Sequence, residues 1–70
     1  MIDVTALTDG DKGKKVRYTS VSKHTIMVGI LQDWTAVSLV VMPTAYEAPK
    51  AVRINTNIPV QMDPANVEFI

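Results

Sequence analysis

The stretch Ile26–Met42 constrains the fold of this chain more than any other. It contains two apolar runs, separated by a short polar break at residues 32–35. Both runs are rich in β-branched residues, which favour a pleated strand over a helix. No window of the sequence carries the i, i+3, i+4, i+7 apolar spacing of a long amphipathic helix. We therefore predict two neighbouring antiparallel strands at the centre of a small sheet.

Both faces of these two strands are largely apolar. Side chains alternate between the two faces of a strand. In the first strand, one face carries Ile26, Val28 and Ile30 and the other carries Met27, Gly29 and Leu31. In the second strand, one face carries Val37, Leu39 and Val41 and the other carries Ser38, Val40 and Met42. This pattern predicts burial on both sides, in a closed or strongly curved sheet. A glycine inside such a run predicts a bend or a close backbone approach.

The N-terminal part of the chain predicts one further strand. Residues 1–8 alternate only loosely and fit either a short strand or a lead-in, and residues 1–10 are expected to be a flexible or edge segment. Residues 9–13 form a turn cluster of Asp, Lys and Gly. Residues 14–19 alternate between polar and apolar side chains, which predicts a half-buried strand. The polar residues 20–25 are expected to form a loop.

The C-terminal part predicts a loop, short strands and one tight turn. Residues 43–50 are bracketed by two prolines and are expected to be a loop that exposes Tyr46. Strands are predicted at 51–55 and 58–62, with turn chemistry at 55–57. Asp63 followed by Pro64 has the chemistry of a helix start, so 63–66 are expected to form a single 3-10 turn. Residues 67–70 then form a closing strand.

The length of 70 residues fits one domain, residues 1–70. A chain of this size buries only about 60% of the surface that its unfolded form exposes. It contains no cysteine, so neither a disulfide nor a thiolate metal site supplements that core. Idealised packing or self-association then remains as the usual source of added stability.

The charges exclude a strongly basic or acidic protein. Lys plus Arg and Asp plus Glu number 7 each, so the formal net charge is zero, whereas a dedicated nucleic-acid clamp usually carries a basic excess. No basic segment precedes an apolar one at the N-terminus, and no apolar run approaches the length of about 18 residues of a membrane helix. We expect a cytoplasmic protein with no membrane partner.

Three motifs in order resemble small SH3-like barrel proteins. Asp11–Tyr18 resembles their opening D-x-G-x-x-V-x-Y strand, and Gly29–Trp34 resembles their second strand, which starts at Gly and ends at an aromatic residue. Asp63–Ile70 is similar to their ending, a 3-10 turn followed by a last strand. The resemblance implies an all-β fold, a small five-stranded SH3-like barrel with a short 3-10 turn before the last strand. Such chains are frequent in bacteriophages and mobile elements, mostly without assigned function.

The same fold class includes an enzyme, the plasmid-borne trimethoprim-resistant dihydrofolate reductase. Its active-site strand carries Val-Gln-Ile-Tyr, and Val60-Gln61-Met62 is similar to the first three of these residues. Asp63 stands where the reductase has tyrosine. The reductase needs four copies of this strand around one pore. This resemblance makes a reductase a distant alternative.

Few residues have the chemistry of a site. His24 is the only histidine and lies in a polar loop, so we predict no catalytic residue, no metal and no cofactor. Aromatic residues that can line a groove, together with a basic strip, give the candidate binding set Tyr18, Trp34, Tyr46, Lys14, Lys15 and Arg17.

A barrel this small has one interior, so part of the second apolar face must lie outside the core. Some of Met27, Leu31, Val40 and Met42 are therefore expected outside it, and Val40 and Met42 are the candidate interface residues. The leading hypothesis is a non-enzymatic protein–protein interaction module that binds a protein partner or itself as a homo-oligomer. A nucleic-acid-binding accessory protein is the alternative.

Overall fold

The computed structural model describes residues 1–48 and 58–70. The described parts contain five strands and three short 3-10 helices and no α-helix, which confirms the all-β prediction. The strands are β1 (Lys15–Thr19), β2 (Ile26–Trp34), β3 (Leu39–Ala48), β4 (Val60–Met62) and β5 (Val67–Phe69), and the 3-10 helices are η1 (Val4–Ala6), η2 (Asp9–Asp11) and η3 (Pro64–Asn66).

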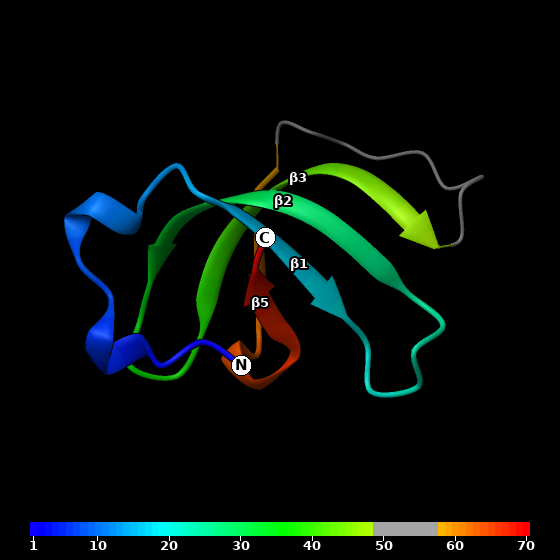
Figure 1. Cartoon of the computed structure of the whole chain (residues 1–70), viewed down its shortest axis with the longest axis horizontal. Coiled ribbons are helices and arrows are strands. Elements are labelled where there is room, and N and C mark those ends of the chain that lie inside the picture. Colours follow the sequence, from blue (N-terminus) through cyan, green and yellow to red (C-terminus); the bar gives the residue numbers. More distant parts are fainter. Residues whose placement is uncertain (49–57) are drawn as a thin grey trace.

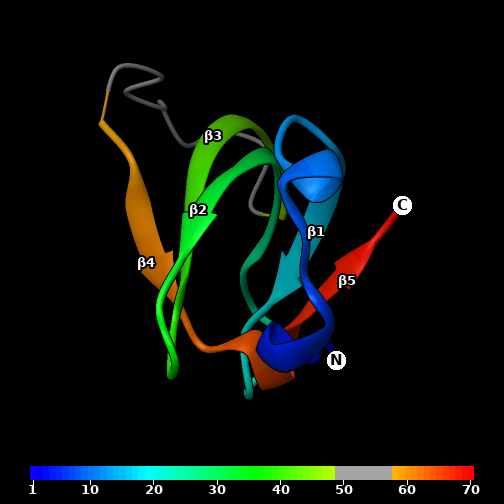
Figure 2. The same cartoon turned by 90° about the vertical axis from the view of Figure 1, so that its left-hand side faces the viewer.

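The five strands form one antiparallel sheet in the order β4-β3-β2-β1-β5. β2 and β3 are the long central strands predicted from the apolar runs, and both curve along their length (Figure 1). β4 and β5 lie on opposite sides of the curled sheet and are joined through η3 (Figure 2). β4 and β5 do not pair with each other, so the described sheet is curved but not closed.

Irregular pairing bends the central strands. The register between β2 and β3 shifts at three places, between Ile26 and Met27, between Val28 and Gly29, and between Leu31 and Asp33. Each shift leaves an extra residue on one strand, which bends that strand and increases its twist. The two strands can therefore be long and still wrap around a small core.

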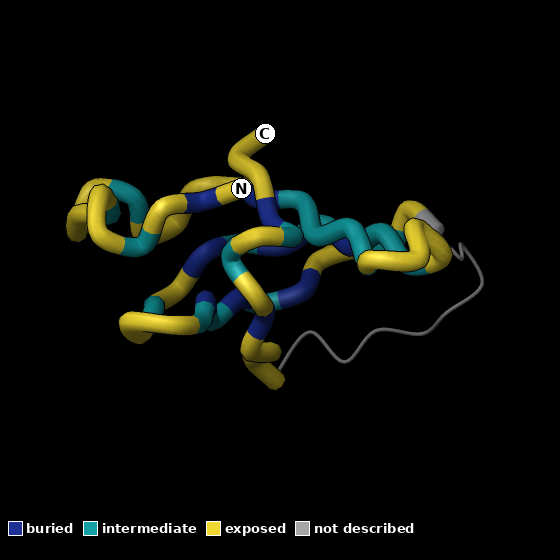
Figure 3. The backbone as a smooth tube through the Cα atoms, turned by 90° about the horizontal axis from the view of Figure 1, so that it is seen from below, coloured by how far each residue is buried: buried dark blue, intermediate teal, exposed yellow. Residues whose placement is uncertain are grey.

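The core lies on the inner, concave side of the sheet. Eight buried apolar residues form it: Ile2, Val16, Met27, Leu31, Leu39, Val41, Met62 and Val67. Buried segments lie toward the middle of the molecule, whereas the loops at its two ends are exposed (Figure 3). All five strands contribute at least one core residue, which explains how so short a chain holds a five-stranded sheet.

The N-terminal segment packs onto this sheet. Residues 1–11 form the two turns η1 and η2 rather than a strand. Ile2 is only 5% exposed, and its backbone N–H donates to the carbonyl oxygen of Pro64 at 3.0 Å. The segment therefore supplies a core side chain and is tied by a backbone hydrogen bond to η3.

The predicted turn before the last strand is confirmed. Asp63 caps η3, because its Oδ1 accepts a hydrogen bond from the backbone N–H of Ala65 at 2.9 Å, and Pro64 occupies the start of the turn. Asn66 N–H then donates to the carbonyl oxygen of Asp63 at 3.0 Å. The turn reverses the chain from β4 to β5.

The prediction of a loop at 43–50 is wrong for its first part. β3 continues through Pro43 as far as Ala48. Pro43 is buried opposite Gly29, beside a register shift, and bulges are positions at which a sheet accepts a residue without a backbone N–H. Tyr46 is consequently a strand residue. The strand and turn predicted at 51–57 lie outside the described residues.

Candidate interaction surface

The side of the sheet that faces away from the core carries an apolar stripe. On β2 the buried residues alternate with the half-buried Ile26, Val28 and Ile30. On β3 the half-buried residues of this side are Val40 and Met42, and Met42 lies directly opposite Ile30. We call these five residues the outer apolar face. Val40 and Met42 thus lie outside the core, as predicted, whereas Met27 and Leu31 lie inside it.

A glycine lets the two strands of this face come together. A Cβ atom on Gly29 would stand 2.5 Å from Cγ1 of Val41 and 2.6 Å from the carbonyl oxygen of Met42, closer than any side chain tolerates. Two residues beyond Met42 on β3, the Thr44 hydroxyl donates to the carbonyl oxygen of Val28 at 3.1 Å. This bond ties the bulged part of β3 to β2, beside the outer apolar face.

Charged residues border the outer apolar face. Arg17 on β1 pairs in register with Val28, and its Nε donates to Oε1 of Glu47 on β3 at 2.9 Å. β1 and β3 are not neighbours, so this ion pair reaches across β2. Lys15 lies opposite Ile30 on the same side of β1 and is exposed. The face therefore has cations along β1 and a carboxylate on β3.

The structure does not assemble the predicted basic strip. Nζ of Lys14 lies 2.7 Å from Oδ1 of Asp11 and 5.5 Å from the centre of the Phe69 ring. Arg17 is paired with Glu47, and Tyr18 packs against the core, on the opposite side of the sheet from Arg17. Of the three predicted cations, Lys15 alone forms no ion pair within the described residues.

The three candidate aromatic residues all pack against the core. Tyr18 on β1 and Tyr46 on β3 lie opposite Met27 of β2, one on each side. Trp34 lies at the other end of β2, opposite Leu39, and Nζ of Lys12 stands 5.6 Å from its ring centre. The tyrosines form one row across the inner side of the sheet, and Trp34 is not part of it.

Two surface carboxyl groups have a lowered pKa, because each accepts hydrogen bonds that stabilise a turn. The pKa of Asp11 lies below its ordinary value, first because Lys14 donates to it and then because the backbone N–H of Thr8 does so. The pKa of Asp3 is lowered by the hydroxyl and then by the backbone N–H of Thr5. These carboxylates accept hydrogen bonds within η1 and η2, which is a structural role.

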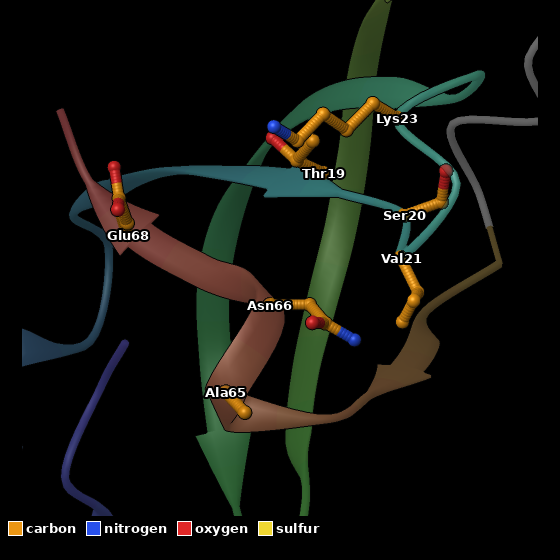
Figure 4. A pocket seen from close by; sticks show the side chains of 7 residues that line it. All are labelled: Thr19, Ser20, Val21, Lys23, Ala65, Asn66 and Glu68. Atoms are coloured by element: carbon orange, nitrogen blue, oxygen red, sulfur yellow. The ribbon is translucent and has the colours of Figure 1, made fainter.

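Two hollows are lined by residues that do not belong to the outer apolar face. One, of about 460 Å³, is lined by Thr19, Ser20, Val21, Lys23, Ala65, Asn66 and Glu68. Its Val21 and Asn66 side chains point toward each other, while Lys23 extends back toward Thr19 (Figure 4). The second, of about 540 Å³, lies between the N-terminal segment, the β2–β3 turn and η3. Both are open to solvent and neither contains a paired acid and base.

His24 is exposed in the β1–β2 loop. Among residues 1–48 and 58–70, no three side chains of His, Cys, Asp or Glu lie close enough together to hold a metal ion. In the same part of the chain, no helix has the length and apolar character needed to cross a bilayer.

Asp63, which stands where the resembling reductases carry tyrosine, caps η3 with its carboxylate. This is a structural use of the side chain at the position where the enzyme's motif ends. Comparison of the chain with protein-family models, with curated proteins and with solved structures found no match.

Sequence reasoning named only part of this surface. Alternation already placed Ile26, Val28 and Ile30 on one side of β2, but both sides of that strand are apolar, so the sequence did not say which side faces the core. Glu47 was hidden by the expectation of a loop. The signal that would have found it is that residues 44–48 are free of glycine and proline, which is compatible with a continued strand.

Proposed function

We propose that this chain is a small, non-enzymatic protein–protein interaction module of the SH3-like barrel class, of bacteriophage or mobile-element type and cytoplasmic. Its binding surface is the outer apolar face, and the partner that we propose for this surface is a second copy of the chain. The closed barrel of this class differs from the described sheet only by pairing at its two edge strands. The strand order and the η3 turn support the assignment to the class.

The observation that carries this proposal is the outer apolar face itself. Five adjacent apolar side chains on two paired strands face away from the core and remain partly open to solvent. Clustered apolar surface on a small protein usually marks a contact with another molecule. A chain of 70 residues without cysteine also gains stability by burying such a face in an assembly.

The nucleic-acid alternative has less support. Backbone-tracking proteins align several cations with aromatic side chains along one groove. Here Lys14 and Arg17 are each bound to a carboxylate, and the aromatic residues lie on the inner side of the sheet. A reductase has less support still, because Asp63 replaces the tyrosine of the motif and caps a turn.

Sedimentation equilibrium over a wide range of protein concentration tests the proposal. We expect reversible association of the wild-type chain, and weaker association of Met42→Gln, which places a polar group of similar length on the outer apolar face. Val37→Gln is the matched control, because Val37 is 80% exposed but lies in the β2–β3 turn. A wild-type chain that stays monomeric at high micromolar concentration contradicts self-association.

A second measurement addresses the nucleic-acid alternative. Binding to random single-stranded and duplex DNA is measured at several salt concentrations, because phosphate contacts release counterions and weaken steeply with salt. We expect no tight binding at physiological salt. Submicromolar, salt-sensitive binding would favour the nucleic-acid function over the interaction module.

A further inference from the structure

We propose that two copies of the chain stack their outer apolar faces about a two-fold axis that runs along β2, so that Arg17 of each copy pairs with Glu47 of the other. This inference rests on the self-association proposed above and specifies its geometry. The ion pair that each monomer makes with itself is then exchanged between copies in the dimer.

The charges on the face are arranged on opposite sides of β2. Lys15 and Arg17 lie on β1, and Glu47 lies on β3. Between them run the apolar side chains of β2. On the same side of the sheet, Glu68 of β5 lies opposite Arg17. The two strands that flank β2 nevertheless carry opposite charges, cations on β1 and a carboxylate on β3, which is a pattern that can complement itself.

Only two simple orientations allow the same face to meet itself. Two sheets that pack face to face are related by a two-fold axis lying in the plane between them, and such an interface brings the same patch of both copies together. An axis perpendicular to the strands would place β1 over β1, so that the cations of one copy would face those of the other. An axis along β2 places β1 over β3 instead. Opposite charges then meet, so the second orientation is favoured.

The offset along the strands is compatible with this exchange where the two convex faces touch, beside β2. Packed sheets lie about 10 Å apart, and a strand advances about 3.3 Å per residue. Arg17 is level with Val28, whereas Glu47 lies between the residues that pair with Ile26 and Met27. The two positions are thus offset by one to two residues along the axis, about 5 Å. An arginine and a glutamate side chain reaching toward each other span this gap.

The apolar residues fit the same axis. Ile26, Val28 and Ile30 lie on it, so each meets the same residue of the second copy. Met42, which is level with Ile30, lies under Lys15 of the second copy, whose aliphatic stem can cover an apolar side chain. At the end of β2, Asp33 approaches its own copy, and Lys12, with Nζ 4.0 Å from Asp33 Oδ1, offsets that charge.

The exchange gives the Arg17–Glu47 ion pair a larger role in the dimer than in the monomer. In the monomer the side chains of Arg17 and Glu47 are 42% and 45% exposed, and such pairs contribute little to stability. In the dimer the same charges lie beside an apolar contact that excludes water. Symmetry supplies two pairs for each interface, which fixes the relative orientation of the copies.

Charge reversal on separate chains tests the exchange directly. Arg17→Glu gives a chain with two acidic residues at positions 17 and 47, and Glu47→Arg gives a chain with two basic ones. In each pure variant, contacts within a chain and between chains are all between like charges. In a mixture the contacts within each chain stay repulsive, but both contacts between unlike chains become attractive.

We expect each pure variant to associate about tenfold more weakly than the wild-type chain, because like charges then meet twice in the interface. We expect the equimolar mixture to recover association near the wild-type level, and native mass spectrometry to detect predominantly mixed dimers. A mixture that associates no better than the pure variants overturns the exchange, as does a statistical distribution of mixed and unmixed dimers.

Three controls make the outcomes distinguishable. A monomeric wild-type chain removes the self-association on which this inference rests, whereas an associating wild type without rescue on mixing removes only the exchange. Far-UV circular dichroism checks that each variant is folded. If a reversed variant unfolds, Arg17→Gln and Glu47→Gln replace it. The exchange then requires that both weaken association and that mixing them recovers part of it, because the mixed dimer regains one of the two ion pairs between chains.

Discussion

Gly29 lies directly against the backbone of Met42, with room for no side chain between them. A Cβ atom at position 29 would stand 2.6 Å from the carbonyl oxygen of Met42. This contact lies where the register of β2 and β3 shifts, next to the outer apolar face. The pairing of β2 and β3 at this point therefore requires a residue without a Cβ atom at position 29.

Gly29→Ala is expected to destabilise the chain by about 3 kcal/mol, because overpacking forces the two backbones apart. Urea unfolding followed by circular dichroism measures this change in the free energy of unfolding. Gly10→Ala is the control, since its nearest atom, Oγ1 of Thr8, would lie at an ordinary 3.6 Å. We expect that variant within about 0.5 kcal/mol of the wild type. Equal effects of the two substitutions would contradict the close approach.

Leu39 and Val40 are neighbours on β3 with opposite surroundings. Leu39 is fully buried, whereas Val40 belongs to the outer apolar face. We expect Leu39→Ala to cost about 3 kcal/mol and Val40→Ala about 1 kcal/mol or less, measured on dilute protein. Val40→Ala should instead weaken self-association. A larger loss of stability at Val40 than at Leu39 would mean that the two faces have been assigned the wrong way round.

Asp63→Ala should cost about 1 kcal/mol, because η3 loses the acceptor for the backbone N–H of Ala65. Asp63→Asn is the matched variant, since its side-chain oxygen can still accept that hydrogen bond, and we expect it to remain near the wild type. Thermal unfolding of the three proteins checks the order. An Asn variant as unstable as the Ala variant would show that charge, rather than capping, is what Asp63 supplies.

Stability should fall in acid, and Asp11 should contribute to the fall. The pKa of Asp11 is lowered in the folded state, chiefly by Lys14, below its ordinary value of 3.8. A lowered folded-state pKa adds stability that is present above the unfolded value and is lost as pH falls through the folded one. Urea midpoints measured from pH 6 to pH 2 should therefore drop less for Asp11→Asn than for the wild type. Parallel curves for both proteins would contradict this.

Patterns within the sequence were sufficient for the elements that depend on local chemistry. Alternating β-branched residues predicted β2 and the start of β3, and Asp63 before Pro64 predicted the η3 turn. These predictions succeeded because side-chain period and capping act between residues that are near in sequence. The loop expected at 43–50 is wrong over residues 43–48, because the prolines were interpreted without the strand that pairs with Pro43. Its position opposite Gly29, at a register shift, is a property of two strands.

The candidate surface was predictable only in part for the same reason. The sequence placed Val40 and Met42 on one face of their strand, and the need for a single core indicated that some apolar residues must remain outside it. It could not pair Arg17 with Glu47, since the two are 30 residues apart and belong to strands that do not touch. Alternation put Tyr18 on the opposite face of its strand from Lys15 and Arg17, but it did not show that the Tyr18 side packs against the core.

The sequence by itself determined that this chain is all-β, where most of its strands begin, and that it has more apolar strand surface than one small core can hold. These properties follow from composition and from the two-residue period of a strand. Only the tertiary structure decided which face of β2 and β3 is buried, because either face is apolar enough. That choice is made by the curvature from the register shifts, by the close approach at Gly29 and by Ile2 filling the core from the N-terminal segment, all of which depend on contacts between residues far apart in the chain.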